Sequence, residues 1–163
     1  MGHDQFFKDF LRAFLGDFLK LLFPDVAARL NLERAQFLDK GLFTDIPEGR
    51  LREADLVAQV KTADGESEIL LIHIEVQAQR ERDFSRRMYQ YYALLWLRYG
   101  LPIFPIVVYL SGSAKGVFRE TYRVRILGRE VLRFVYECVG LSALGAGRYG
   151  AMENPVAALR WRL

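Results

Sequence analysis

Two apolar segments joined by a turn constrain the fold of this chain more than any other feature of its sequence. Residues 51–61 and 68–77 are rich in Val, Ile and Leu, and the pair Asp64-Gly65 lies between them. Apolar runs of this length on either side of an Asp-Gly pair are typical of a β-hairpin. The sequence therefore predicts a β-sheet built around this hairpin, and the other segments are interpreted as packing on it or extending it.

Aromatic and aliphatic residues at helical spacing precede the hairpin. Between Gln5 and Pro24 they recur every three or four positions, with charged residues between them. This spacing predicts an amphipathic helix with a core-facing stripe, and the charges argue against a signal peptide or a membrane span. The stripe consists of Phe7, Phe10, Leu11, Phe14, Leu15, Phe18, Leu19 and Leu22. Pro24 is expected to end the helix, and residues 25–49 are interpreted as a connector with a short helix or strand near Ala35–Leu38.

A helix and a strand are predicted directly after the hairpin. Residues 80–98 show helical spacing, and Gly100 followed by Pro102 is expected to end that helix. The continuous apolar run 103–110 predicts a strand that is buried on both faces. The predicted order is thus helix, hairpin, helix, strand, which indicates a mixed α/β fold.

The whole chain, residues 1–163, is predicted to form a single domain. It has 163 residues, of which 52% are hydrophobic and 26% charged, and neither a long linker nor an internal repeat divides it. Residues 3–112 are interpreted as its core and 113–163 as an extension, with a second hairpin around Gly128 and a short helix from Pro155. The chain ends within that helix, which is compatible with a longer parent chain.

Cysteine content and net charge narrow the classes of function. Cys138 is the single cysteine, which excludes a disulfide framework and a cysteine-based zinc site and favours a reducing, cytoplasmic compartment. The formal net charge of +3 permits a nucleic-acid partner without requiring one.

Two carboxylates are the strongest candidates for chemistry. Asp55 and Glu75 each lie within an apolar run of the hairpin, where a carboxylate loses hydration and needs a partner. Mg²⁺ prefers such oxygen ligands together with waters and phosphates, so the pair predicts a magnesium site. A loop with an odd number of residues would place Asp55 opposite Glu75, whereas a two-residue Asp-Gly turn would place them on opposite faces. The sequence leaves both registers open.

The local motifs resemble a known group of nucleases. An acidic residue in one strand, followed by Glu-x-Lys or a variant of it in the next, is similar to the signature of the PD-(D/E)XK nuclease superfamily. The residues within these motifs most closely resemble those of the Rpn (recombination-promoting nuclease, YhgA-like) family of putative transposases. The matching segments are His3-Asp4, Phe7-Lys8, Ala54–Val57, Ile72–Gln77, Phe84, Arg87-Met88, Tyr91 and Pro102–Val107. The resemblance implies a restriction-endonuclease-like core, a central mixed sheet flanked by helices in the order α-β-β-β-α-β.

The same resemblance implies a metal-dependent DNA endonuclease, acting in recombination or on mobile DNA. Asp55, Glu75 and the backbone carbonyl of Val76 would hold Mg²⁺ or Mn²⁺, and Asp4 would either join them or cap the first helix. Gln77 takes the place of the usual lysine; it can orient a water molecule or a phosphate oxygen but brings no positive charge.

Three further residues have two interpretations each. Arg86 and Arg87 follow the hairpin and would either bind a DNA phosphate or lie on a solvated helix face. His73 is expected to be structural, although its spacing from Glu75 would let it reach the site.

Two other functions remain open from the sequence. Gln77 is compatible with a catalytically weakened nucleic-acid-binding module on the same fold. The aromatic N-terminal helix is compatible with a protein-interaction or oligomerisation domain, and a homodimer is an open alternative. The expected partner is DNA, and neither a membrane nor a small-molecule cofactor is expected.

Overall fold

The computed structural model describes residues 3–38, 42–43, 52–63 and 68–143. Its helices are α1 (His3–Ala13), α2 (Leu15–Leu22), α3 (Pro24–Ala27) and α4 (Phe84–Tyr99), with a 3-10 turn at Leu141–Ala143. Its strands are β1 (Leu30–Phe37), β2 (Leu42–Phe43), β3 (Arg52–Glu53), β4 (Leu56–Thr62), β5 (Ile69–Gln77), β6 (Ile103–Tyr109), β7 (Gly116–Ile126) and β8 (Arg129–Gly140). Among these, no helix has the length and apolar character needed to cross a membrane.

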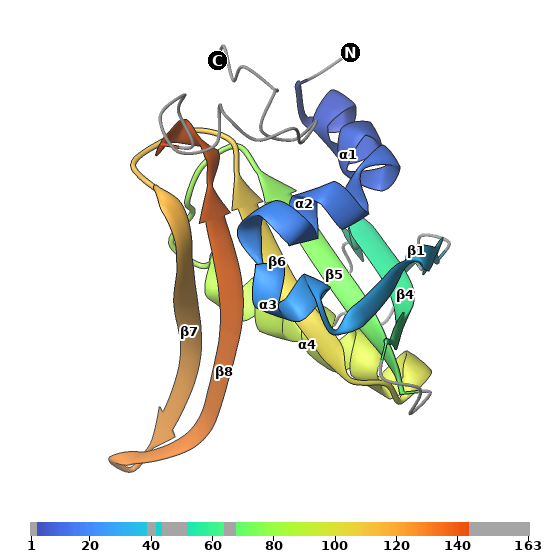
Figure 1. The fold of residues 1–163 in the computed structure, drawn as a ribbon. Coiled ribbons are helices and arrows are strands. Elements are labelled where there is room, and N and C mark those ends of the chain that lie inside the picture. Colours follow the sequence, from blue (N-terminus) through green and yellow to red (C-terminus); the bar gives the residue numbers. More distant parts are fainter. Residues whose placement is uncertain (1–2, 39–41, 44–51, 64–67, 144–163) are drawn as a thin grey trace.

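A six-stranded mixed sheet in the order β1-β4-β5-β6-β8-β7 forms the centre of the molecule (Figure 1). Helices α1–α3 cover one face of β4, β5 and β6, and α4 lies on the other face. The succession of α1–α3, β1, β4, β5, α4 and β6 reproduces the expected order α-β-β-β-α-β. The mixed α/β class is confirmed, and β7 and β8 extend the sheet beyond this core.

The predicted N-terminal helix is divided into two. Phe14 separates α1 from α2, and its backbone angles of φ −125° and ψ 31° are not helical. Helix α2 ends at Leu22, just before Pro24, as expected, and Pro24 then begins the short helix α3, where its missing N–H costs no hydrogen bond. The apolar stripe itself is confirmed, since most of its members are buried against the sheet and the others pack at its border.

The short helix or strand expected near Ala35–Leu38 is a strand, but it is longer than expected: β1 has eight residues and begins at Leu30, within the stretch interpreted as a connector. This strand lies at the edge of the sheet, pairs with β4 and has a register shift between Asn31 and Gln36. Its middle is exposed at Glu33 and Arg34, so the apolar alternation that marks a strand is missing.

The central hairpin formed by β4 and β5 is confirmed. The two strands are antiparallel, with Leu56 opposite Ile74 and Lys61 opposite Ile69. The number of residues between Lys61 and Ile69 is odd, so the register that brings Asp55 level with Glu75 is the one adopted. A two-residue turn at Asp64-Gly65 would have needed the other register and is wrong.

Strands β5, β6 and β8 run parallel, and Gln77, Tyr109 and Gly140 lie in one row across them. Helix α4 connects β5 to β6 and begins at Phe84, so residues 80–83 precede it instead of belonging to it as expected. It ends at Gly100, whose φ of 62° is the left-handed conformation that glycine adopts without strain. The carboxyl end of β5 and the amino end of α4 therefore lie at the same end of the sheet, where the parallel strands finish.

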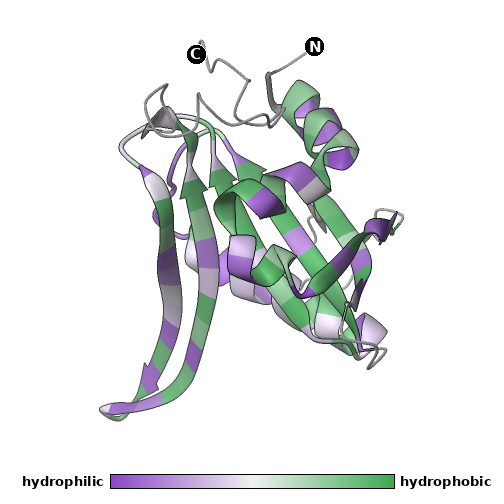
Figure 2. Ribbon diagram, viewed as in Figure 1, coloured by the Kyte–Doolittle hydropathy of each residue, from purple (hydrophilic) through white to green (hydrophobic). Residues whose placement is uncertain are grey.

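Apolar side chains pack on both sides of the sheet. Hydrophobic residues predominate along its central strands (Figure 2). On one side α1–α3 bury Leu11, Phe18 and Leu19 against Ile72 and Ile74 of β5. On the other side Phe84 and Met88 of α4 pack on β6 and β8.

The second predicted hairpin is confirmed as β7 and β8, and both strands are longer than expected. The predicted helix from Pro155 lies outside the described residues.

Candidate functional site

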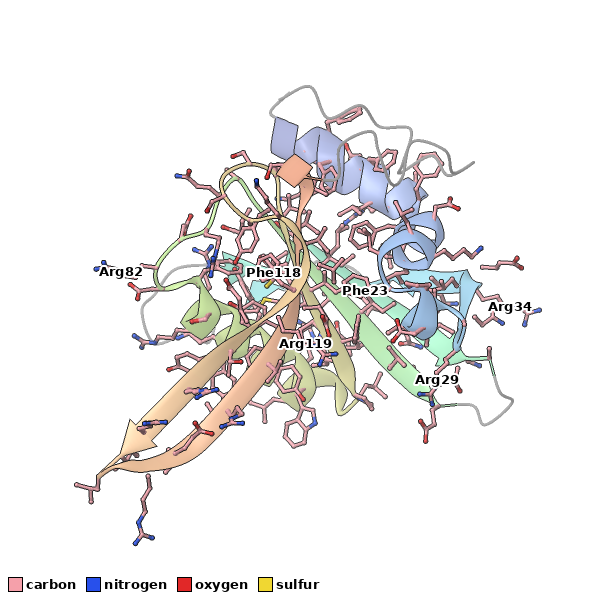
Figure 3. The ribbon with its side chains drawn as sticks, turned by 60° about the vertical axis from the view of Figure 1, so that its left-hand side comes forward. Phe23, Arg29, Arg34, Arg82, Phe118 and Arg119 are labelled. Carbon is pink, nitrogen blue, oxygen red and sulfur yellow. The ribbon has the colours of Figure 1, made fainter. Side chains whose placement is uncertain are left out.

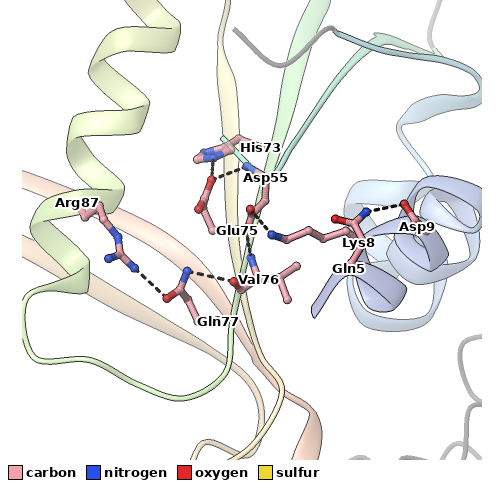
Figure 4. Close-up of polar contacts among 9 residues, drawn as sticks. All are labelled: Gln5, Lys8, Asp9, Asp55, His73, Glu75, Val76, Gln77 and Arg87. Atoms are coloured by element: carbon pink, nitrogen blue, oxygen red, sulfur yellow. Dashed lines mark hydrogen bonds and ion pairs between the residues drawn. The ribbon is translucent and has the colours of Figure 1, made fainter. Parts of the chain in front are cut away.

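One hydrogen bond joins Asp55 to Glu75, and a second joins Asp55 to Val76, where β4 begins and β5 ends (Figure 4). The Asp55 backbone N–H donates to Glu75 Oε1 at 3.0 Å, and Asp55 Oδ2 accepts from the Val76 backbone N–H at 2.8 Å. Asp55 was expected within a strand; it lies in a bend immediately before β4. The bend frees its backbone N–H from the ladder, so the N–H can reach the Glu75 carboxylate. The structure thus brings the two predicted carboxylates together.

The environment of Asp55 makes its carboxyl group harder to ionise than that of a free aspartate. Burial and the nearby charge of Glu75 raise the pKa of Asp55, in that order of importance, while Lys8 and the Val76 N–H act in the opposite direction. The Asp55 and Glu75 carboxylates repel each other when both are ionised. A cation between them would relieve that repulsion, which is the electrostatic condition for a metal site.

Lys8 of α1 reaches the same carboxylate and was not predicted as a site residue. Its Nζ lies 2.6 Å from Asp55 Oδ1, and both side chains are only 16% exposed. The buried neighbours Phe7 and Leu11 hold α1 against the sheet and so fix where Lys8 emerges. The sequence contained one signal for it, the Phe7-Lys8 motif, but nothing in the local pattern shows that α1 crosses above Asp55.

His73 belongs to the site by contact. Its Nε2 donates to Glu75 Oε1 at 2.8 Å, and both residues are almost completely buried. Tyr91 of α4 meets the imidazole edge-on, with ring centroids 5.6 Å apart. The Nδ1 atom has no hydrogen-bond partner among the described residues. The expectation of a purely structural histidine is therefore incomplete, because His73 orients the Glu75 carboxylate directly.

Gln77 links the site to α4 through two hydrogen bonds. Its Nε2 donates to the Val76 carbonyl at 3.0 Å, and its Oε1 accepts from Arg87 Nη2 at 2.8 Å. Arg87 also lies 4.5 Å from the centre of the Phe84 ring, which steadies the guanidinium. Arg86 is exposed on the same helix. Of the two predicted arginines, Arg87 is the one that the structure connects to Gln77.

The donor set fits a hard divalent cation. Two carboxylates and a backbone carbonyl oxygen are the ligands that Mg²⁺ and Mn²⁺ prefer, with waters and phosphate completing the shell. Within the described residues, no three His, Cys, Asp or Glu side chains are grouped to hold a metal, so the protein would contribute few ligands. Asp4 lies in α1, but its side chain is outside the described part of the structure.

One family of proteins matches this chain. The family model described as "Putative transposase, YhgA-like" matches residues 1–115, a segment that contains every site residue named above. The resemblance noted in the sequence motifs is confirmed at the level of this family. Neither a curated protein nor a solved structure matches the chain.

Proposed function

Because the chain belongs to the family of YhgA-like putative transposases, we propose that it is a metal-dependent DNA endonuclease that hydrolyses phosphodiester bonds. The observation that carries this proposal is the pairing of Asp55 and Glu75 where β4 begins and β5 ends. The order α-β-β-β-α-β also supports assigning the core to the PD-(D/E)XK superfamily.

In this proposal, Asp55, Glu75 and the Val76 carbonyl hold Mg²⁺ or Mn²⁺. When bound, such an ion activates a water molecule and stabilises the charge that develops on the phosphate. His73 and the Asp55 N–H keep the Glu75 carboxylate in one orientation through their contacts with Oε1.

Positive charge comes from residues outside the usual lysine position. Gln77 is uncharged, but the Lys8 ammonium lies beside Asp55 and the Arg87 guanidinium holds Gln77. We assign to Lys8 the stabilisation of the phosphate charge and to Gln77 the orientation of a water or a phosphate oxygen. Arg87 is a positioning residue that fixes the Gln77 amide.

Plasmid cleavage tests the proposed function directly. We expect the purified protein to nick supercoiled plasmid with Mg²⁺ or Mn²⁺ and to be inactive with EDTA. The Asp55→Asn variant, purified identically, should leave the plasmid intact, which excludes a contaminating nuclease. Intact plasmid with every metal would contradict an endonuclease; if the protein still bound DNA with strong salt dependence, the alternative of a binding module would hold instead.

Removing the charge of Lys8 should slow cleavage by about 100-fold in Lys8→Met, the typical loss when one preorganised charge donor is removed from an active site. Lys8→Arg should keep part of the activity, and Lys20→Met, which alters an exposed lysine of α2, should keep all of it. Steady-state rates of plasmid nicking measure the effect.

The pH profile separates this role from a structural one. Lys8 lowers the pKa of Asp55, so its removal should raise that pKa and move the acidic limb of the rate profile to higher pH. A Lys8→Met enzyme with full activity and an unchanged profile would show that the ammonium has no part in the reaction.

A further inference from the structure

The outer part of the β7–β8 hairpin projects past the rest of the sheet (Figure 1). We call residues 121–133 the arm. Four arginines, at positions 123, 125, 129 and 133, and one glutamate, Glu130, are its charged residues. The arm lies beyond residues 1–115, the part of the chain that matches the family model. Its charge is thus a property of this extension and is separate from the site described above.

Three of the four arginines, Arg123, Arg125 and Arg133, lie on one face of the hairpin, and Arg129 is paired with Ile126 on the other. Tyr122 and Phe134 point toward α4 and stack on its aromatic residues Tyr89 and Tyr92. Side chains alternate along a strand, so Arg123 and Arg125 point away from α4. Arg133 lies directly opposite Arg123, an arrangement of like charges that costs stability in a sheet.

Two of these arginines, Arg125 and Arg129, form no salt bridge with the described residues. Glu130 contacts both Arg123 and Arg133, at 3.7 and 2.7 Å. The side chains of Arg125 and Arg129 are both exposed, and Arg125 lies across the hairpin from Glu130 without forming an ion pair with it. Their charge is available to an external anion.

The tip of the arm ends in an exposed leucine with unusual backbone geometry. Leu127 is 96% exposed, and its φ of 51° is left-handed, as is the φ of 77° at Gly128. A two-residue turn of this kind favours Asn, Asp or Gly at its first position, and a leucine there is strained. Ile126 and Val131 beside it are also more than half exposed. An apolar tip between arginines is typical of ribbons that enter a groove of bent DNA.

The length of the arm matches the geometry of a duplex. Gly116, at the start of β7, lies in the same row of the sheet as Gln77, through Tyr109 and Gly140. Eleven residues of extended strand then carry the chain about 36 Å away, close to the length of one turn of B-DNA.

We propose that the arm is a second DNA contact, which binds the phosphate backbone about one turn of duplex away from the cleavage site and inserts Leu127 into a groove. This proposal rests on the proposed function, because it assumes that the substrate is duplex DNA. The positive charge also disfavours pairing of the arm with the arm of a second copy, since like charges would face each other.

A matched pair of double variants tests the arm. Arg125→Gln/Arg129→Gln removes two charges from it, and Arg29→Gln/Arg34→Gln removes two exposed charges from the opposite edge of the sheet (Figure 3). Affinity is measured by fluorescence anisotropy with EDTA, so that cleavage plays no part, on duplexes of about 10 and about 30 base pairs.

We expect the arm variant to bind the longer duplex about tenfold more weakly and to reduce the slope of log affinity against log salt by about 2. Its affinity for the shorter duplex should be almost unchanged, and the control variant should bind both duplexes as the wild type does. Leu127→Asn should also weaken binding to the longer duplex while melting at the same or a higher temperature, because asparagine suits the left-handed turn.

The other outcomes are distinguishable. If the wild-type protein bound no DNA, both the proposed role of the arm and the proposed function would be wrong. If it bound DNA and both double variants behaved alike, only the proposed role of the arm would be wrong. If the arm variant lost self-association in sedimentation but kept its DNA affinity, the surface would be a contact between copies of this chain.

Discussion

Replacing Glu75 with glutamine should abolish metal-dependent cleavage and leave the fold intact. The two hydrogen bonds that Glu75 makes, with the Asp55 N–H and His73 Nε2, both end on Oε1. The amide oxygen of glutamine can accept both, so the shape of the site is kept while its negative charge is lost. A metal supplies several kcal/mol of transition-state stabilisation, and a loss of about 4 kcal/mol corresponds to a rate about a thousandfold lower.

The direction in which Glu75→Gln changes the stability of the fold can also be predicted. Glu75 is one of the two causes that raise the pKa of Asp55, so its replacement by a neutral amide lowers that pKa and removes the charge repulsion between the two side chains. We therefore expect Glu75→Gln to unfold at the same temperature as the wild type or at a higher one.

Calorimetry with and without metal completes the test. Mg²⁺ or Mn²⁺ should raise the melting temperature of the wild type by binding only its folded state, and this increase should be absent in Glu75→Gln. A variant that is inactive because it is unfolded would melt lower in both conditions. A variant that still cleaves plasmid would remove Glu75 from the proposed metal site.

Local patterns were sufficient to predict the elements on which the site is built. The β4–β5 hairpin, α4 and β6 each follow from a periodicity within a short segment, and the two carboxylates were conspicuous because they interrupt apolar runs. The register was not determined in this way. It depends on how many residues the turn contains, and an Asp-Gly pair is compatible with either parity.

The features that local sequence patterns did not predict depend on contacts between segments that are far apart in the chain. Lys8 and Asp55 are far apart in the sequence, and only the packing of α1 on the sheet brings them together. Strand β1 was predicted only in part, as a short helix or strand near Ala35–Leu38, because it lies at an edge of the sheet that faces solvent. Polar residues there replace the alternation that identifies a strand. The parallel pairing of β8 with β6 also has no local signature.

Gly140→Ala is expected to be the most destabilising small substitution in the sheet extension. A Cβ atom at this position would lie 2.2 Å from the carbonyl carbon and oxygen of Ala114 and 2.5 Å from the backbone nitrogen of Lys115. These are backbone atoms, so no side chain can turn aside to make room. The row that joins Gln77, Tyr109 and Gly140 would have to shift, and we expect a loss of about 3 kcal/mol in the free energy of unfolding.

Gly16→Ala is the matched control for this prediction. A Cβ at Gly16 of α2 would meet only the Leu32 Cβ, at an ordinary contact distance of 3.7 Å. Alanine also favours the helix, so this variant should be about 0.5–1 kcal/mol more stable than the wild type. Urea unfolding of both variants measures the difference. If Gly140→Ala were as stable as Gly16→Ala, the 114–115 segment would not lie against β8, and the base of the β7–β8 hairpin would have to be placed differently.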